Sequence, residues 1–177
     1  GRRLALRLSR DGNHDIYIFD VAASRLTRLT KHPGIDTEPA WSPNGRYLVF
    51  TSDRSGRPHI FRISAAGGPA QRLTKEGREN AGASYDPNGK HLVMVTNQGN
   101  GDQIGVFYTG NNELKLLTDG PLDDSPTYSP NGAMIMYATQ RGNQGVLAAV
   151  SADGRIKQIL RLHQGEVREP AWSSRKQ

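Results

Sequence analysis

The chain has 177 residues, of which 35% are hydrophobic and none is cysteine, and it carries a formal net charge of +6. The absence of cysteine excludes disulfide bonds and thiolate zinc sites. Basic residues are scattered and often stand beside acids, as in Arg10-Asp11, so the charge does not predict a nucleic-acid partner. No apolar run approaches the roughly 18 residues of a membrane span, and we expect no direct insertion into a membrane.

The first thirty residues (1–30) predict three short strands. Residues 3–8, 15–19 and 25–29 are rich in strand-forming side chains, and polar turn residues separate them. They correspond to strands two to four of the repeat that follows. Because the chain begins inside a predicted strand and without Met, we expect it to be a segment of a longer protein.

Residues 38–74 predict a complete four-stranded antiparallel sheet. A short first strand ends at Trp41 and leads into Ser42-Pro43-Asn44-Gly45, where Pro presets the backbone for a tight turn. The next run, at residues 47–51, is apolar and β-favouring, as expected of an inner strand that is buried on both faces. The sheet is completed by predicted strands at residues 59–63 and 71–74.

The same pattern returns at residues 82–118 and 125–161, and its first strand alone returns at 168–173. The aromatic residue before the turn recurs at intervals of 44, 43 and 44 residues, at Trp41, Tyr85, Tyr128 and Trp172. A second motif keeps this interval and ends at Thr30, Thr74 and Thr118. A period in the forties with four strands per repeat is typical of a β-propeller. Residues 1–177 therefore predict an all-β fold of four four-stranded blade-equivalents.

The two ends of such an array would leave sheet edges unpaired, and unpaired edges favour uncontrolled association. We expect the strands of residues 1–30 to pair with the terminal strand 168–173. This pairing could close a ring within one chain or join two chains in a homodimer, and the sequence leaves both open. Four blades are at the small limit for propellers, so a portion of a larger ring is an equal alternative.

Several segments together carry a resemblance to a known family. The turn at Pro39–Gly45 is shared by many propellers, including those of prolyl-oligopeptidase-type peptidases. Here it is joined by Phe50–Pro58, Gly67–Thr74 and Leu122–Pro126, and a further Pro-Ala-Trp-Ser stands at Pro170–Ser173. This combination resembles the WD40-like repeats of the TolB family, and the resemblance covers essentially the whole chain.

The resemblance implies a non-catalytic, protein-binding propeller of the periplasmic Tol-Pal system. In this family a six-bladed propeller follows an N-terminal α/β domain, so the chain would correspond to the last four blades. The family binds the peptidoglycan-associated lipoprotein on one propeller face, which colicin segments also use, and it meets other Tol proteins through the part missing here. These contacts would support outer-membrane integrity and cell division. Two alternatives stay open: the gating propeller of an oligopeptidase-like hydrolase, and a repeat array without a ligand.

Two sets of loops define what we call the polar-loop face. The loops from strand four to the next blade and those from strand two to strand three share one side of a propeller, and here they are polar. The opposite side receives the short Pro-Asn-Gly and Gly-Gly-Pro turns. Binding usually resides in polar loops on a rigid scaffold. We therefore predict partner contacts for His32, Asp36, Thr37, Glu38, Asn80, Asp123, Asp124, Ser125, Arg168 and Glu169.

Each candidate also has a plain structural role open to it. Glu38 and Glu169 could point to a partner in the central channel, or neighbouring loop amides could hold them. The pair Asp123-Asp124 could ligate Ca²⁺, although a lone acidic pair is more typical of a solvated turn. Asp53 and Arg54 favour a local turn hydrogen bond and ion pair.

No sequence motif asks for a catalytic role. The five histidines lack the spacing of a zinc site, and the chain contains no G-x-S-x-G elbow, no phosphate-binding P-loop and no dinucleotide-binding glycine motif. We therefore expect no enzyme activity, assign no catalytic or metal-binding residue, and expect no cofactor apart from the Ca²⁺ considered above.

Overall fold

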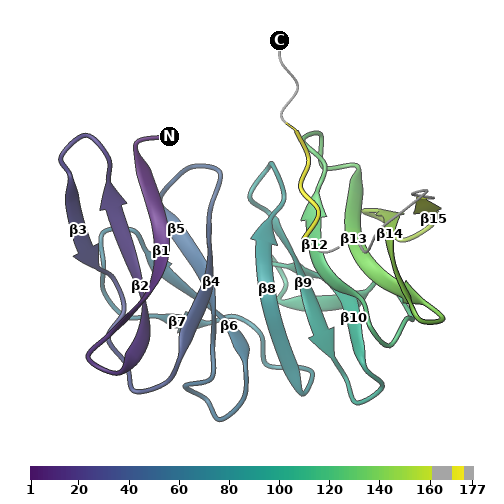
Figure 1. Ribbon diagram of the computed structural model, residues 1–177, viewed down its shortest axis with the longest axis horizontal. Coiled ribbons are helices and arrows are strands. Elements are labelled where there is room, and N and C mark those ends of the chain that lie inside the picture. The colour runs from purple at the N-terminus through teal and green to yellow at the C-terminus, as the bar shows by residue number, and fades with distance from the viewer. Residues whose placement is uncertain (161–168, 174–177) are drawn as a thin grey trace.

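The computed structural model describes residues 1–160 and 169–173, and this part of the chain folds into fifteen strands that form four antiparallel sheets (Figure 1). The strands of the first two sheets are β1 (Arg3–Arg10), β2 (Asn13–Asp20), β3 (Arg25–Arg28), β4 (Asp36–Trp41), β5 (Tyr47–Ser52), β6 (His59–Ser64) and β7 (Gln71–Arg72). Those of the third and fourth sheets are β8 (Glu79–Tyr85), β9 (His91–Asn97), β10 (Asp102–Tyr108), β11 (Glu113–Leu116), β12 (Asp124–Tyr128), β13 (Met134–Arg141), β14 (Gln144–Ser151) and β15 (Lys157–Leu160). Among the described residues, no helix is long and apolar enough to cross a membrane.

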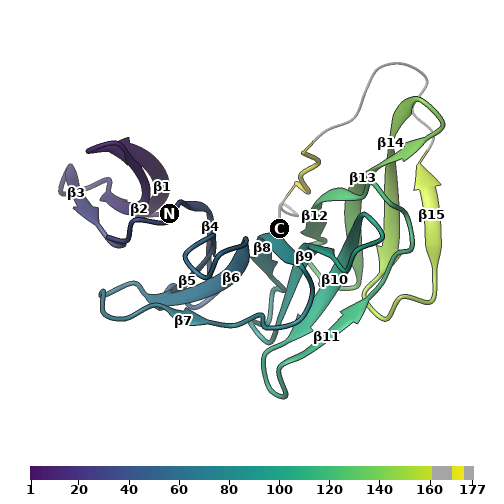
Figure 2. The same cartoon turned by 90° about the horizontal axis from the view of Figure 1, so that it is seen from below.

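The sheets stand side by side along an arc. Figure 2 shows β4, β8 and β12 on the concave side of this arc and β7 and β11 on its convex side. Within each sheet the strand order follows the chain, so each strand pairs with its neighbours in sequence. This arrangement confirms the predicted all-β fold built from propeller blades.

The predicted closure within one chain is not found. Residues 169–173 contain no strand, and the indole N–H of Trp172 donates to the Thr127 carbonyl at 3.2 Å, beside β12 rather than β1. Figure 2 shows the first and fourth sheets at opposite ends of the arc, so the four sheets form an open arrangement and not a closed ring. Pairing between two chains stays a prediction. Arg168, the first residue of the expected terminal strand, lies outside the described residues.

The hydrophobic core lies between neighbouring sheets. The inner strand β5 is buried on both faces as predicted, and Leu48, Val49 and Phe50 are fully buried. Each interface between sheets has its own cluster of buried side chains, including Ile16 with Phe50 for the first, Ile60 with Phe107 for the second, and Ile104 with Tyr137 for the third. Folding of one sheet therefore depends on the apolar face of the next.

The recurring Pro-Asn-Gly turn is also a contact between blades. Its glycine adopts a positive φ of 66° at Gly45 and of 72° at both Gly89 and Gly132, which favours glycine there. A Cβ added at Gly89 would lie 3.4 Å from Pro43 of the preceding blade. The glycine thus gives the turn its conformation and lies against the neighbouring turn.

The three recurring threonines cap the third strand of their own blades. Their hydroxyl oxygens accept a backbone N–H at 2.9, 3.0 and 2.8 Å, Thr30 from Ile16, Thr74 from Ile60 and Thr118 from Ile104. All three threonines are buried. A buried N–H without a partner is costly, so this motif of the sequence is explained by the backbone and not by a ligand.

Candidate partner-binding site

A bulge interrupts the first strand of each complete blade. In β4 the register with β5 shifts between Thr37 and Ala40, and equivalent shifts occur in β8 and β12. The backbone there adopts a positive φ of 52° at Glu38, 62° at Gly82 and 53° at Ser125, and Glu169 repeats it at 49°. A bulge removes one residue from the ladder and re-aims its side chain. Each blade therefore presents one special position on the concave side of the arc.

Glu38 uses this position to join two blades. Its Oε2 accepts a hydrogen bond from the Thr51 hydroxyl at 2.7 Å and another from the backbone N–H of Gly82, in the next blade, at 2.9 Å. The Glu38 side chain is nevertheless exposed. Both roles considered for Glu38 therefore fit the structure, since neighbouring groups hold the carboxylate while it still faces solvent.

The bulge of the next blade has no side chain, and a pocket of about 280 Å³ lies beside it, between β8 and β12. A Cβ at Gly82 would meet no atom within 4 Å, so the space is open. This blade also lacks the hydroxyl that holds Glu38 in the preceding blade. Val95 pairs with β8 at the position where Thr51 pairs with β4, so Val95 is the equivalent of Thr51. The pocket brings together four of the ten predicted contact residues: Glu38, Asn80, Asp124 and Ser125.

The pocket is acidic although the chain is basic overall. The carboxylates in its lining belong to Glu38, Glu79, Asp102 and Asp124. Among the described residues that line it there is no Lys or Arg, and its apolar part is formed by Pro58, Val95 and Pro126. Such a site favours hydrogen-bond donors and cations over acidic ligands.

Three predicted contact residues lie within one residue of the start of the first strand of their blades, and all three are buried. Asp36 and Asn80 are 0% exposed and Asp123 is 2% exposed. Arg54 Nη2 lies 2.8 and 2.7 Å from the two oxygens of Asp36, so the ion pair of this arginine reaches the first strand of the blade and is not local to its own turn as predicted. Asp123 accepts a hydrogen bond from the Thr139 hydroxyl. Asp36 and Asp123 are therefore not accessible to a partner in this structure, whereas Asn80 lies in the pocket lining although it is buried.

The remaining predicted contact residues lie outside the pocket lining. His32 is half-buried, and its Nδ1 accepts the Gly34 N–H at 2.9 Å. Thr37 is half-buried and Glu169 is exposed. Arg168 lies outside the described residues.

Sequence reasoning did not select three residues that shape the pocket. Glu79 and Asp102 are the first residues of β8 and β10 and adjoin polar loops, where many charged residues are equally good candidates. Gly82 differs from the residues at the equivalent position of the other repeats, which are Glu or Ser. Comparing the repeats at equivalent positions is the signal that would have identified it.

The acidic residues do not gather into a metal centre in the described part of the chain, where no three His, Cys, Asp or Glu side chains converge. One oxygen of Asp123 accepts the Thr139 hydroxyl, and one oxygen of Asp124 accepts the Ser125 N–H at 2.6 Å. The two neighbouring carboxylates are therefore engaged separately.

His59 contacts the pocket residue Asn80, and its titration makes the stability of the protein depend on pH. It is 5% exposed, and its Nδ1 lies 3.2 Å from Asn80 Nδ2, which can donate only to an unprotonated ring nitrogen. Burial, with a smaller effect of the Arg72 cation, lowers the pKa of His59 below its ordinary 6.5. As pH falls through 6.5 the unfolded chain takes up this proton first, so we expect the free energy of unfolding to decrease.

His59→Gln tests this expectation, because Gln103 is the equivalent residue of the next blade and is also buried. Urea unfolding between pH 7.5 and 5.5 should show a smaller loss of stability in the variant than in the wild type. Equal losses in both proteins would rule out His59 as the source.

Stacked antiparallel sheets, one of three strands and three of four strands, define the chain as a β-propeller portion. The family model described as "TolB beta propeller domain" matches residues 1–176. The chain belongs to the TolB β-propeller family.

Known members of this family are similar over most of the chain. The Tol-Pal system protein TolB of Bordetella pertussis is 43% identical over 158 residues, which are 89% of this chain and 36% of that protein. The TolB of Thioalkalivibrio sulfidiphilus is 53% identical over 80 residues, which are 45% of this chain and 18% of that protein. The crystal structure of TolB from Acinetobacter baumannii superposes with a TM-score of 0.88 at 38% identity, covering 96% of this chain and 43% of that one.

The chain thus spans little more than a third of the curated relatives that it matches over most of its length. A puromycin hydrolase is also similar in structure, with a TM-score of 0.73, but its 18% identity shows a shared fold alone. The family assignment rests on the TolB proteins.

Proposed function

We propose that this chain is part of a non-catalytic, periplasmic propeller of the Tol-Pal system that binds the peptidoglycan-associated lipoprotein on its polar-loop face. The observation that carries the proposal is the acidic pocket between β8 and β12, on a scaffold of the TolB family. Through this contact the protein would support outer-membrane integrity and cell division. Colicin segments would compete for the same face, and other Tol proteins would bind outside this chain.

The chemistry of the pocket supports a protein partner that offers donors. Four carboxylates and the apolar residues Pro58, Val95 and Pro126 line the pocket, so an extended segment with backbone N–H groups or a basic side chain could bind there. The pocket lies where the polar loops meet the inner strands, and the strands beneath it are fixed by buried polar contacts. A rigid site of this kind loses little conformational entropy on binding.

Gly82→Glu is expected to weaken binding of the lipoprotein's periplasmic domain at least tenfold, about 1.4 kcal/mol, because the new side chain fills the pocket. The backbone should accept it, since Glu38 and Glu169 adopt similar φ angles of 52° and 49° at equivalent positions. Isothermal titration calorimetry would measure the affinity. Asn88→Lys, at an exposed turn residue on the opposite side, is the matched control and should bind normally.

The combination Glu38→Ala with Asp124→Ala is a second variant that removes charge without filling space. It should also weaken binding, and affinity retained in both variants would refute the assignment of this pocket. If the unaltered chain failed to bind the lipoprotein while an intact TolB bound it, the missing blades would be required, and the partner site could not reside in this pocket alone.

A further inference from the structure

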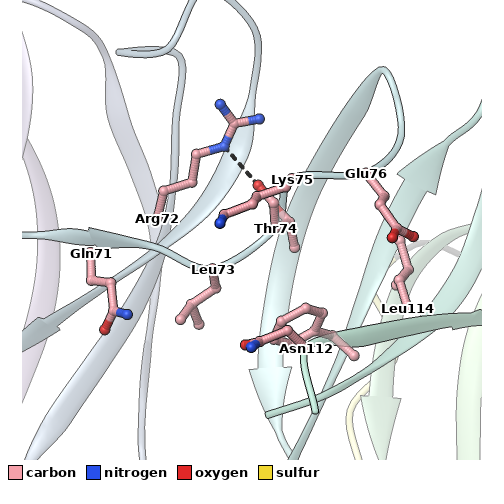
Figure 3. A pocket seen from close by; sticks show the side chains of 9 residues that line it. Gln71, Arg72, Leu73, Thr74, Lys75, Glu76, Asn112 and Leu114 are labelled. Carbon is pink, nitrogen blue, oxygen red and sulfur yellow. Dashed lines mark hydrogen bonds between the residues drawn. The ribbon is translucent and has the colours of Figure 1, made fainter. Parts of the chain in front are cut away.

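A second pocket lies on the convex side of the arc, between the outer strands of the second and third sheets (Figure 3). Its volume is about 190 Å³, and it shares no lining residue with the acidic pocket. The floor is apolar and is formed by Leu73, Phe107 and Leu114, of which the first two are buried. We call this site the outer groove.

The equivalent groove between the third and fourth sheets is bridged by charged side chains. Lys157 Nζ lies 2.9 Å from Asp119 Oδ1, and Lys115 Nζ donates to the Asp153 carbonyl at 3.0 Å. Strand pairing establishes which residues of the two grooves correspond. Leu114 pairs with Phe107 in the third sheet, and Lys157 pairs with Val150 in the fourth sheet, so Leu114 and Lys157 are equivalent.

In the outer groove these bridging groups are replaced. Leu114 stands where Lys157 would be, Lys75 where Asp119 would be, and Gln71 where Lys115 would be. The ion pair cannot form, and within the described residues Lys75 takes part in none. These three replacements therefore remove the contacts that bridge the neighbouring groove.

One wall of the outer groove is a free strand edge. β7 is the outermost strand of its sheet, and the Leu73 N–H bonds to the Ile60 carbonyl at 2.8 Å. Because hydrogen-bonded and outward-facing residues alternate along an antiparallel strand, the N–H and carbonyl of Arg72 face away from β6. An extended peptide could pair with this edge.

The charged residues beside this edge favour a negatively charged ligand. Arg72 and Lys75 both belong to the β7 wall (Figure 3), and Arg72 uses only its Nε, which donates to the Thr74 carbonyl at 2.7 Å. Glu76 is the single acid in the lining. We propose that the outer groove binds an extended peptide segment of a partner protein, with an aliphatic side chain on the Leu73–Phe107–Leu114 floor and an adjacent Asp or Glu at Arg72 and Lys75. This site is distinct from that of the proposed function and does not depend on it.

The probe is the acetylated and amidated pentapeptide Thr-Leu-Val-Asp-Gly, titrated into the ¹⁵N-labelled chain and followed by NMR. Amide signals of Arg72, Lys75 and Leu114 should shift. Lys75→Asp with Leu114→Lys, which rebuilds the ion pair of the neighbouring groove, should weaken binding at least tenfold. Lys31→Asp makes the same charge change at the equivalent, exposed residue of the preceding blade and should leave binding unchanged.

Well-dispersed spectra would verify that the variants fold. Leu114→Lys alone is a single-residue version of the double variant that perturbs the fold less. The proposal is overturned if the signals that shift lie elsewhere, or if a peptide with Lys in place of Asp binds equally well. It is also overturned if the double variant binds as the wild type does. Concentration-dependent shifts of the same signals without peptide would identify a second copy of the chain as the occupant and would equally overturn it.

Discussion

Replacing Arg54 by methionine is expected to lower the free energy of unfolding by about 3–5 kcal/mol, the range found when one partner of a buried ion pair is removed. The Asp36 side chain is fully buried, and Arg54 is its hydrogen-bonding partner. The guanidinium also lies over the rings of Phe50 and Phe61, with its carbon 5.3 and 5.0 Å from their centroids. Methionine would keep part of this packing but would leave the carboxylate uncompensated.

Urea unfolding with linear extrapolation would measure the loss. Arg57→Met is the matched control, because Arg57 lies in the same loop but is exposed, and its replacement should cost no more than about 0.5 kcal/mol. Adding Asp36→Leu to Arg54→Met should recover part of the stability, since the buried charge is then gone. A loss below about 1 kcal/mol for Arg54→Met would mean that water reaches Asp36.

The fold was predictable because the local signals repeat. The interval between Trp41, Tyr85 and Tyr128 fixes the period, and the apolar run at residues 47–51 identifies a strand that the structure buries on both faces. Each complete blade repeats the same turn with a glycine at positive φ, so a correct strand assignment for one repeat applies to the other repeats. Closure was not predictable in the same way, because the angle between neighbouring sheets depends on packing and leaves no periodic pattern in the sequence.

The candidate site was predictable only as a face. Polarity selected the loops near the pocket, but it could not distinguish Asp36 and Asp123, which are buried, from Asp124, which is exposed. All three are acids close to a strand start. Burial at this position is decided by side chains distant in sequence, such as Arg54 for Asp36, and single-residue polarity does not encode them.

Gly101→Ala is expected to destabilise the protein by about 3–4 kcal/mol, combining backbone strain with overpacking. Gly101 adopts a φ of +101°, and a Cβ there would clash with the Pro121 carbonyl oxygen and lie 2.7 Å from the Pro121 Cα. Pro121 cannot move freely, because its carbonyl accepts the Asp102 N–H at 2.9 Å. The strand edge would have to separate from the loop that precedes β12.

Gly99→Ala separates the two causes within the same loop. Gly99 has a similar φ of +111°, but a Cβ there would meet only the flexible side chain of Arg78, at 3.4 Å. Strain alone should then cost about 1–2 kcal/mol. Equal losses of stability in urea for the two variants would contradict the role given to the Pro121 contact.

Gly101→Ala should also alter the structure of the acidic pocket. The Asp123 N–H donates to the Asp102 carbonyl at 2.9 Å, so displacing this bridge moves Asp102 and the start of β12, both of which contribute to the lining. NMR spectra of Gly101→Ala should therefore show shifted amide signals at residues 121–125, which Gly99→Ala leaves in place. Gly101 would thus control the shape of the pocket by permitting two backbone segments to approach each other.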